Sequence, residues 1–232
     1  MIVRSTLIID ADDTLWENNI HFEQAGESFL DLVAERGGDR ETAKELLMRI
    51  ERRNVPVHGY GTRGFTRSMM DTLEEVTGRS ASTEDRERIL ALGAEVRRMP
   101  IQFLPGVMRT LPILKERHRL ILFTKGDPDE QQAKVSRSGA RAFFHEAEFT
   151  SEKAPADYER LIEKHAIDRF RSWMVGNSPR SDVNPALQVG LGAVFIPHPN
   201  TWIFEHEEVR ARDGARLMVL KRFSELLFHI FD

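Results

Sequence analysis

Residues 6–14 read Thr-Leu-Ile-Ile-Asp-Ala-Asp-Asp-Thr, a short apolar run that ends abruptly in three carboxylates. A short run rich in β-branched residues is typical of a buried parallel strand. Side chains two residues apart on an extended chain point the same way, so Asp10 and Asp12 are expected to converge at the carboxyl end of this strand. Ligands bind at that edge of open α/β sheets, and clustered carboxylates indicate a cation or a chemical role. The structural alternative is an Asp-rich turn that caps the next helix.

Composition limits the class of protein. The chain has 232 residues, of which 41% are apolar and 30% charged, as expected for a soluble globular protein with one α/β core and a sizeable insertion. The net charge of −4 offers no basic field for nucleic acid. The chain has no cysteine, which excludes disulfides, thiolate nucleophiles and Cys-ligated zinc. No signal peptide or membrane-spanning run is evident, so we expect a cytoplasmic protein without nucleic-acid or membrane partners.

Residues 17–100 are expected to form an all-helical insertion. Apolar residues recur at helical spacing in four groups between positions 22 and 96, without a convincing strand. Asp39 and Ser82 are predicted N-caps, and Asp85 completes a capping box with Ser82. Gly78 is predicted to end the third helix. The pattern predicts a small helical bundle.

Strands and helices alternate after residue 100. Strands are predicted at 120–123, within 143–149, and at 173–175, 193–196 and 217–220, and helices at 107–114, 128–139, 155–164, 185–189 and 223–230. Such alternation is typical of a doubly wound parallel sheet with helices on both faces. We therefore expect an α/β core formed by residues 1–16 and 101–232.

Polar residues follow several of these strands. They are Thr124-Lys125, Ser151-Glu152-Lys153, and Gly176-Asn177-Ser178 with Asp182 four residues after the serine. In a parallel sheet these ends share one edge with Asp10 and Asp12. Oxygen ligands without His or Cys favour magnesium, and a lysine and a hydroxyl beside a cation suit a phosphoryl group. Taken singly, Thr124 could cap a turn, Lys153 could be a solvated surface lysine and Asp182 could cap a helix.

On these motifs the sequence resembles the haloacid dehalogenase (HAD) superfamily of phosphohydrolases. The stretch Ile8-Ile9-Asp10-Ala11-Asp12-Asp13-Thr14 is similar to its first motif, Leu122-Phe123-Thr124 to its second, Lys153 with Pro155 to its third, and the segment from Gly176 to Asp182 to its fourth. The resemblance covers the whole chain. It implies a Rossmann-like HAD core, with residues 17–100 where the family carries a helical cap.

The resemblance also implies roles for individual residues. Asp10 would be the nucleophile that forms an aspartyl-phosphate, and Asp12 the general acid and base. Thr124 would bind a phosphoryl oxygen and Lys153 would neutralise charge. The implied Mg²⁺ site consists of Asp10, the backbone carbonyl of Asp12, and the fourth motif with Asn177 and Asp182. Asn177 departs from the family, which usually has an aspartate there; an amide oxygen binds Mg²⁺ without contributing charge.

Two further residues are candidates for substrate contacts. Lys125 follows Thr124 and is placed with it among the phosphate-binding residues. Arg63 belongs to the segment Gly59-Tyr60-Gly61-Thr62-Arg63-Gly64, which spells G-x-G-x-x-G. No strand precedes this segment, so nicotinamide binding is rejected. The simpler interpretation of this segment is a flexible loop between helices. If it is a substrate loop instead, Arg63 would contact an anionic leaving group.

The sequence thus predicts a magnesium-dependent phosphatase that acts on a small phosphorylated metabolite. By the resemblance, Asp12 favours phosphate chemistry, because cleavage of a carbon–halogen bond needs no acid two residues after the nucleophile. A sugar-phosphate mutase and a non-catalytic phosphoryl-binding module remain alternatives, the second suggested by Asn177. A two-component receiver is disfavoured by the long insertion and by the lack of an Asp on a central strand. The sequence does not indicate the substrate or the oligomeric state.

Overall fold

The structure is a computed structural model in which residues 5–229 and 231 are described. Its internal contacts divide the chain into two compact units. The first unit comprises the residues up to Asn19 and those from Ile101 onward, and the second comprises Ile20–Pro100. The first segment of the α/β unit therefore extends to Asn19, three residues beyond the boundary expected from the sequence.

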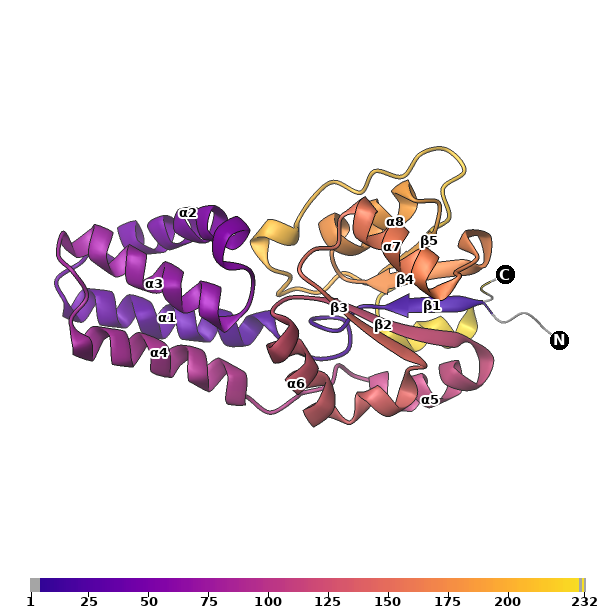
Figure 1. The fold of residues 1–232 in the computed structure, drawn as a ribbon, viewed down its shortest axis with the longest axis horizontal. Helices are drawn as coiled ribbons and strands as arrows, with labels where there is room; N and C mark the ends of the chain where they lie inside the picture. The colour runs from indigo at the N-terminus through magenta and orange to yellow at the C-terminus, as the bar shows by residue number, and fades with distance from the viewer. Residues whose placement is uncertain (1–4, 230, 232) are drawn as a thin grey trace. The chain divides into compact units, whose positions relative to one another are not determined.

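The first unit is built on a six-stranded sheet in the order β3-β2-β1-β4-β5-β6, with every neighbouring pair parallel (Figure 1). The strands are β1 (Thr6–Ile9), β2 (Arg119–Lys125), β3 (Glu146–Thr150), β4 (Ser172–Gly176), β5 (Gly192–Phe195) and β6 (Leu217–Val219). The apolar strand that opens the chain pairs with β2 on one side and β4 on the other, and it is buried along its length. The predicted doubly wound parallel sheet is confirmed.

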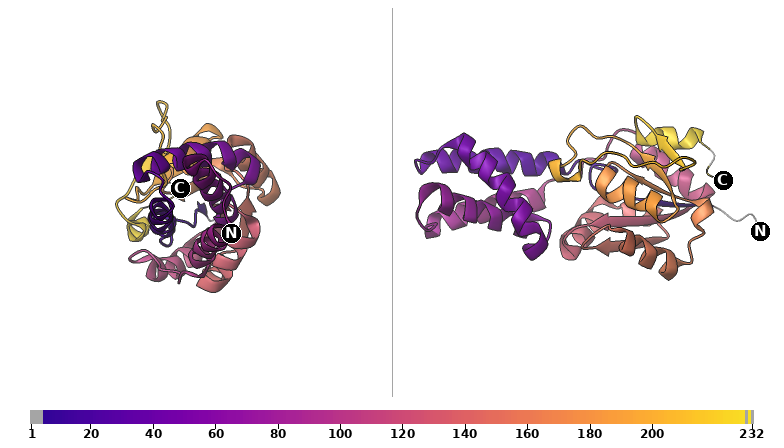
Figure 2. Two further views of the ribbon diagram at one scale, coloured as in Figure 1. Left: turned by 90° about the vertical axis from the view of Figure 1, so that its left-hand side faces the viewer. Right: turned by 90° about the horizontal axis from the view of Figure 1, so that it is seen from above.

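Helices cover both faces of this sheet, as Figures 1 and 2 show. They are α5 (Val107–Arg117), α6 (Pro128–Ser138), α7 (Pro155–His165) and α8 (Asn184–Gln188). Leu7 and Ile9 belong to an apolar cluster with residues of α5 and α6, whereas Ile8 belongs to a cluster with residues of α7 and α8. Because side chains alternate along a strand, the run Leu7-Ile8-Ile9 supplies both cores.

The end of the chain differs from the prediction. A 3-10 helix covers Phe223–Phe228, where the sequence predicted a longer helix to Ile230, which lies outside the described residues. Six residues is a long run for the tighter i to i+3 pattern, which is usually limited to about three or four. A π-helix, Pro179–Val183, precedes α8, and a 3-10 helix, Ile203–Glu205, follows β5; 3-10 turns also cover Ala140–Phe143 and Arg169–Arg171.

The second unit contains α1 (Asn19–Glu35, which begins in the first unit), α2 (Arg40–His58), α3 (Thr62–Thr77) and α4 (Thr83–Arg98). The predicted caps are confirmed: Asp39 accepts from Thr42 N–H, Gly78 has the left-handed φ of 65°, and Ser82 forms a capping box with Asp85. The helix α2 continues through Pro56 to His58. Pro56 lies in the last turn, where its missing N–H costs a single intrahelical bond.

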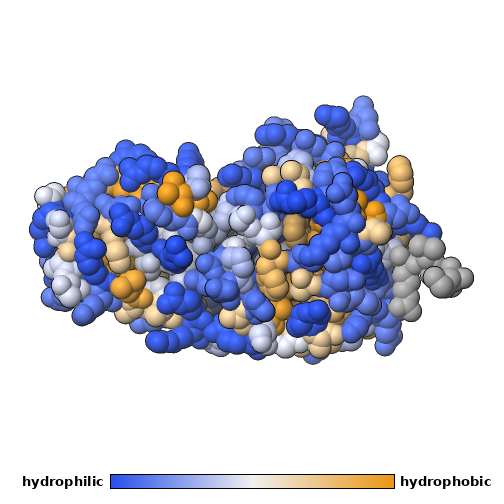
Figure 3. Space-filling view, viewed as in Figure 1, coloured by the Kyte–Doolittle hydropathy of each residue, from blue (hydrophilic) through white to orange (hydrophobic). Residues whose placement is uncertain are grey.

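The surface is predominantly polar on the face drawn in Figure 3, where apolar atoms form small separate groups. Large apolar side chains that are exposed come from different elements, such as Val57 on α2, Phe170 before β4 and Phe228 near the end of the chain. Among the described residues, no helix is long and apolar enough to cross a membrane.

The substitution Ser82→Ala should lower the free energy of unfolding of the helical unit by about 1 kcal/mol, because it removes the side-chain acceptor for the N–H of Asp85. Urea denaturation followed by circular dichroism measures the change. Ser80→Ala is the matched control, since Ser80 is exposed and precedes the helix. Equal stability of the two variants would contradict the capping role.

Candidate active site

Three predicted site residues meet at the carboxyl edge of the sheet. Asp10 follows β1, Lys153 follows β3 and Asp182 lies in the π-helix after β4. The Nζ atom of Lys153 lies 2.5 Å from Oδ1 of Asp10 and 2.8 Å from Oδ1 of Asp182. The side chains of Lys153 and Asp182 are each 1% exposed, so these ion pairs are shielded from solvent. One ammonium group therefore neutralises parts of two buried carboxylates.

Two oxygen atoms converge on the hydroxyl of Thr14. Its Oγ1 lies 3.0 Å from Oδ2 of Asp10 and 3.1 Å from Oδ1 of Asn177. Nδ2 of Asn177 donates to Oγ1 of Thr201, and that hydroxyl donates to the carbonyl of His198, each over 2.9 Å. Because the Thr201 proton is engaged, the amide must offer Thr201 its nitrogen, which leaves its oxygen on the side of Asp10.

Asp182 has both oxygens engaged. Its Oδ2 accepts the N–H of Ser178 over 2.9 Å, while Oδ1 faces Lys153. A Cβ at Gly176 would lie 2.1 Å from Oδ2 of Asp182, so the close approach of strand and carboxylate requires a glycine. Both oxygens of Asp10 have partners as well, since Oδ1 faces Lys153 and Oδ2 faces Thr14.

Asp12 is bound by a separate set of donors. Nε1 of Trp16 and Nε2 of Gln131 each lie 2.8 Å from one of its oxygens, and Nζ of Lys134 lies 2.6 and 2.7 Å from the two. The same Gln131 nitrogen lies 3.2 Å from Oγ1 of Thr124. Gln131 therefore joins two residues that the sequence assigned to catalysis.

The surroundings shift the pKa values of Asp10 and Asp12 in opposite directions. Burial raises the pKa of Asp10 to about 7, and the nearby Asp182 adds to the rise while Lys153 opposes it. Burial also disfavours the ionised form of Asp12, but the charge of Lys134 and the hydrogen bonds from Lys134, Gln131 and Trp16 outweigh it and lower the pKa of Asp12. The partners of Asp12 thus favour its ionised form.

Lys125 has acidic and hydroxyl partners. Its Nζ lies 2.6 Å from Oε1 of Glu205 and 2.9 Å from Oγ of Ser181, and Glu205 also accepts from the hydroxyl of Ser178. Lys125 thereby links β2 to the segment that carries Asp182. Arg63 lies in the helical unit at the start of α3, and its place relative to Asp10 is not defined.

Four residues with evident roles were not singled out from the sequence: Thr14, Gln131, Lys134 and Glu205. Gln131 and Lys134 are three residues apart on α6, so their shared helical face could have been inferred once the helix was predicted. Thr14 belongs to the first motif itself. Glu205 is 80 residues from Lys125, and no local pattern predicts such a pair.

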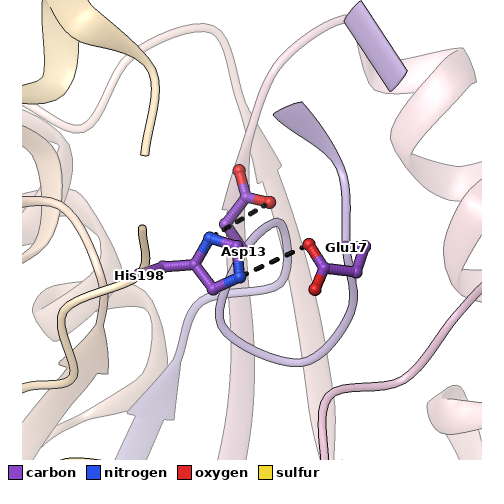
Figure 4. Close-up of side chains that lie close together, drawn as sticks. All are labelled: Asp13, Glu17 and His198. Atoms are coloured by element: carbon purple, nitrogen blue, oxygen red, sulfur yellow. Dashed lines mark ion pairs between the residues drawn. The ribbon is translucent and has the colours of Figure 1, made fainter. Parts of the chain in front are cut away.

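A second cluster lies beside the first motif (Figure 4). Nδ1 of His198 lies 3.9 Å from Asp13 Oδ1, and Nε2 lies 3.4 Å from Glu17 Oε2. The three side chains offer ligand atoms within 4.8 Å of one another, as a metal site requires. Nδ1 of His198 also accepts the N–H of Asn200 over 3.3 Å, and Asp13 accepts the N–H groups that open α1. These contacts give the cluster a structural role at the start of α1.

Asp13 has an unusual backbone and an unusual acidity. Its φ is 57°, a conformation that L-residues rarely adopt outside turns. Burial raises the pKa of Asp13 to about 7, with a further contribution from Asp12, while the N–H groups of Asn18 and Asn19 oppose the rise. The turn that follows Asp10 is thus fixed by the side chain for which the sequence suggested no chemistry.

Comparisons with known proteins identify the family of the chain. A family model for haloacid dehalogenase-like hydrolases matches residues 5–190. A solved haloacid dehalogenase-like family hydrolase from Xanthomonas campestris is 29% identical with a TM-score of 0.84, over 96% of this chain and 88% of that one. A 2-haloacid dehalogenase from Pseudomonas syringae pv. Tomato is 22% identical with a TM-score of 0.64, over 97% of each chain. A structure described as a predicted phosphoglycolate phosphatase from Haemophilus somnus is 15% identical with a TM-score of 0.63, over 97% of each chain.

The search of curated proteins gives no match. The family match spans well over half of the chain, and the chain therefore belongs to the haloacid dehalogenase-like hydrolases. The resemblance inferred from the four motifs is confirmed. The dehalogenase and the phosphatase are too distant in sequence to show more than the shared fold.

The substitution Lys153→Met should lower the free energy of unfolding by about 3 kcal/mol or more, because it leaves Asp10 and Asp182 buried together without their cation. Lys164→Met is the control. Its partner Glu148 and the lysine itself form an exposed pair, for which a change below about 1 kcal/mol is expected. Chemical denaturation of both variants measures the difference. Equal losses would mean that the buried pairs contribute no more than a surface pair.

Proposed function

We propose that this protein is a magnesium-dependent phosphatase that hydrolyses a small phosphomonoester through an aspartyl-phosphate on Asp10. The observation that carries the proposal is the arrangement of Asp10 and Asp12. They are two residues apart and are held by different lysines, so that one carboxylate adjoins a buried ammonium group and the other has its own set of donors. A nucleophile and a separate acid–base group are what phosphomonoester hydrolysis by this route requires.

The first half-reaction forms the covalent intermediate. A carboxylate oxygen of Asp10 attacks phosphorus, and the bond between phosphorus and the leaving oxygen breaks. Asp12 must first take up a proton, against the preference for the ionised form that Lys134 gives it, and it then gives this proton to that oxygen. Lys153 lies against Asp10 and neutralises charge on the nucleophile, and the hydroxyl of Thr124 is assigned to a phosphoryl oxygen.

The second half-reaction restores the enzyme. Asp12, now a carboxylate, takes a proton from water as the water attacks phosphorus, and the bond to Asp10 breaks to release inorganic phosphate. The pairing of Asp12 with Lys134 favours the ionised form that this step needs. Lys125 and Arg63 are proposed as further contacts to the anionic substrate.

The donors present fit a hard divalent cation. Oδ2 of Asp10 and Oδ1 of Asn177 face the same hydroxyl, and the backbone carbonyl of Asp12 and the carboxylate of Asp182 complete the proposed ligand set. Oxygen donors of this kind suit Mg²⁺ rather than softer metals. When bound, Mg²⁺ would offset negative charge between the nucleophile and the phosphoryl group.

The deciding experiment measures inorganic phosphate released from a panel of phosphomonoesters with Mg²⁺, and halide released from 2-haloacids in parallel. We expect phosphate and no halide, and we expect Asp10→Asn to lower the rate by at least about 10³-fold, because it removes the nucleophile. Circular dichroism of the variant controls for folding. Halide release would indicate a dehalogenase, isomerised phosphosugar a mutase, and the absence of all products a non-catalytic binding protein.

The substitution Thr201→Val should weaken Mg²⁺ binding by about tenfold, because the amide of Asn177 loses the partner that directs its oxygen toward Asp10. Calorimetric titration of the free protein with Mg²⁺ measures the affinity. Thr77→Val is the control, since its hydroxyl bonds a backbone carbonyl within the helical unit. Unchanged affinity would remove Asn177 from the proposed ligand set.

The cytoplasmic location and the absence of nucleic-acid partners remain predictions from composition.

A further inference from the structure

Lys134 makes contacts that the proposed chemistry does not yet use. It lies on α6, three residues after Gln131 and therefore on the same helical face. Its Nζ reaches both carboxylate oxygens of Asp12 and lies 2.9 Å from Oδ1 of Asn18. An ammonium group has three protons, and three acceptors surround this one. Lys134 thus joins α6 to the turn of residues 12–18.

The pair differs from an ordinary surface ion pair. The side chains of Lys134 and Asp12 are each 19% exposed; in the pair of Lys164 with Glu148 the acid is 22% exposed, but the lysine is 62% exposed. Solvent screening is weaker in the partly buried pair, and the geometry is constrained on the acid side as well. Trp16 binds one oxygen of Asp12 and Gln131 the other, and of these three donors Lys134 alone contacts both oxygens.

We propose that Lys134 is a positioning residue for catalysis, which fixes the carboxylate of Asp12 in the orientation from which it exchanges a proton with the leaving group and with water. The inference rests on the phosphatase function proposed above. A side chain on a turn can adopt several rotamers. Proton transfer requires one of them, in which the carboxylate is held within hydrogen-bond reach of the reacting oxygen. Trp16 and Gln131 each supply one neutral donor, and Lys134 supplies the cation that contacts both oxygens.

A direct contact between Lys134 and the substrate phosphate is the less favoured role. The three acceptors already around its Nζ would have to be given up for a phosphoryl oxygen. The phosphoryl group is instead adjacent to Asp10, whose own lysine is Lys153. Lys134 is accordingly expected to act through Asp12. Kinetic measurements can distinguish this effect on catalysis from an effect on stability alone.

The test is a double-mutant cycle on the full chain, with 4-nitrophenyl phosphate and phenyl phosphate as substrates. Lys134→Met should lower kcat for phenyl phosphate by about tenfold or more and change KM by less than about twofold. The loss should be smaller with 4-nitrophenyl phosphate, whose better leaving group depends less on a proton from Asp12. In the Asp12→Asn background, Lys134→Met should change kcat by less than about twofold.

Controls separate positioning from stability and from the parent proposal. Lys134→Arg keeps the cation and should recover most of the lost kcat, and it serves if the methionine variant does not fold. Lys164→Met should leave kcat unchanged. An active wild type with equal kcat in Lys134→Met, or equal losses with and without Asp12, overturns the positioning role and leaves the phosphatase function intact. A wild type that releases no phosphate overturns both.

Discussion

The structure depends on a buried ammonium group shared by two carboxylates. Lys153 lies between Asp10 and Asp182, and each of the three comes from the end of a different strand. Buried charges are tolerated only when they are paired, so the strand order β3-β2-β1-β4 and this triad require each other. Two carboxylates against one lysine also leave a negative charge uncompensated within the triad. That imbalance is a physical reason for a cation site at this edge of the sheet, independent of any relative.

Two acids that are two residues apart are given different properties by their surroundings. Burial and Asp182 raise the pKa of Asp10, whereas Lys134 and neutral donors lower that of Asp12. If Asp10 reacts as a carboxylate, a cation bound beside it would have to lower its pKa again. The separation here comes from two lysines on different elements, Lys153 after β3 and Lys134 on α6. Asp13, with a φ of 57°, turns the chain directly after the two acids.

The sequence predicts what depends on local pattern. The run Leu7-Ile8-Ile9 predicts a strand buried on both faces, and polar residues at strand ends predict a shared edge; the structure brings Asp10, Lys153 and Asp182 together there. The caps at Asp39 and Ser82 are confirmed for the same reason. The pairing of Lys125 with Glu205 could not be predicted, because the path of a long loop after β5 decides it. Arg63 stays a prediction, since its distance from the core is a property of two separate units.

Because Asn177 is an amide and not a carboxylate, the orientation of its side chain decides which atom faces Asp10. An aspartate at this position would add a third carboxylate near Asp10 and Asp182, with Lys153 as the cation between those two. The amide avoids that repulsion, but only its oxygen can bind a cation, because its NH2 group repels one. Thr201 resolves this by accepting from Nδ2 while its own proton binds the carbonyl of His198. The loop after β5 therefore contacts the site through a hydroxyl that no motif marks, and the proposed affinity for a metal ion would depend on that loop.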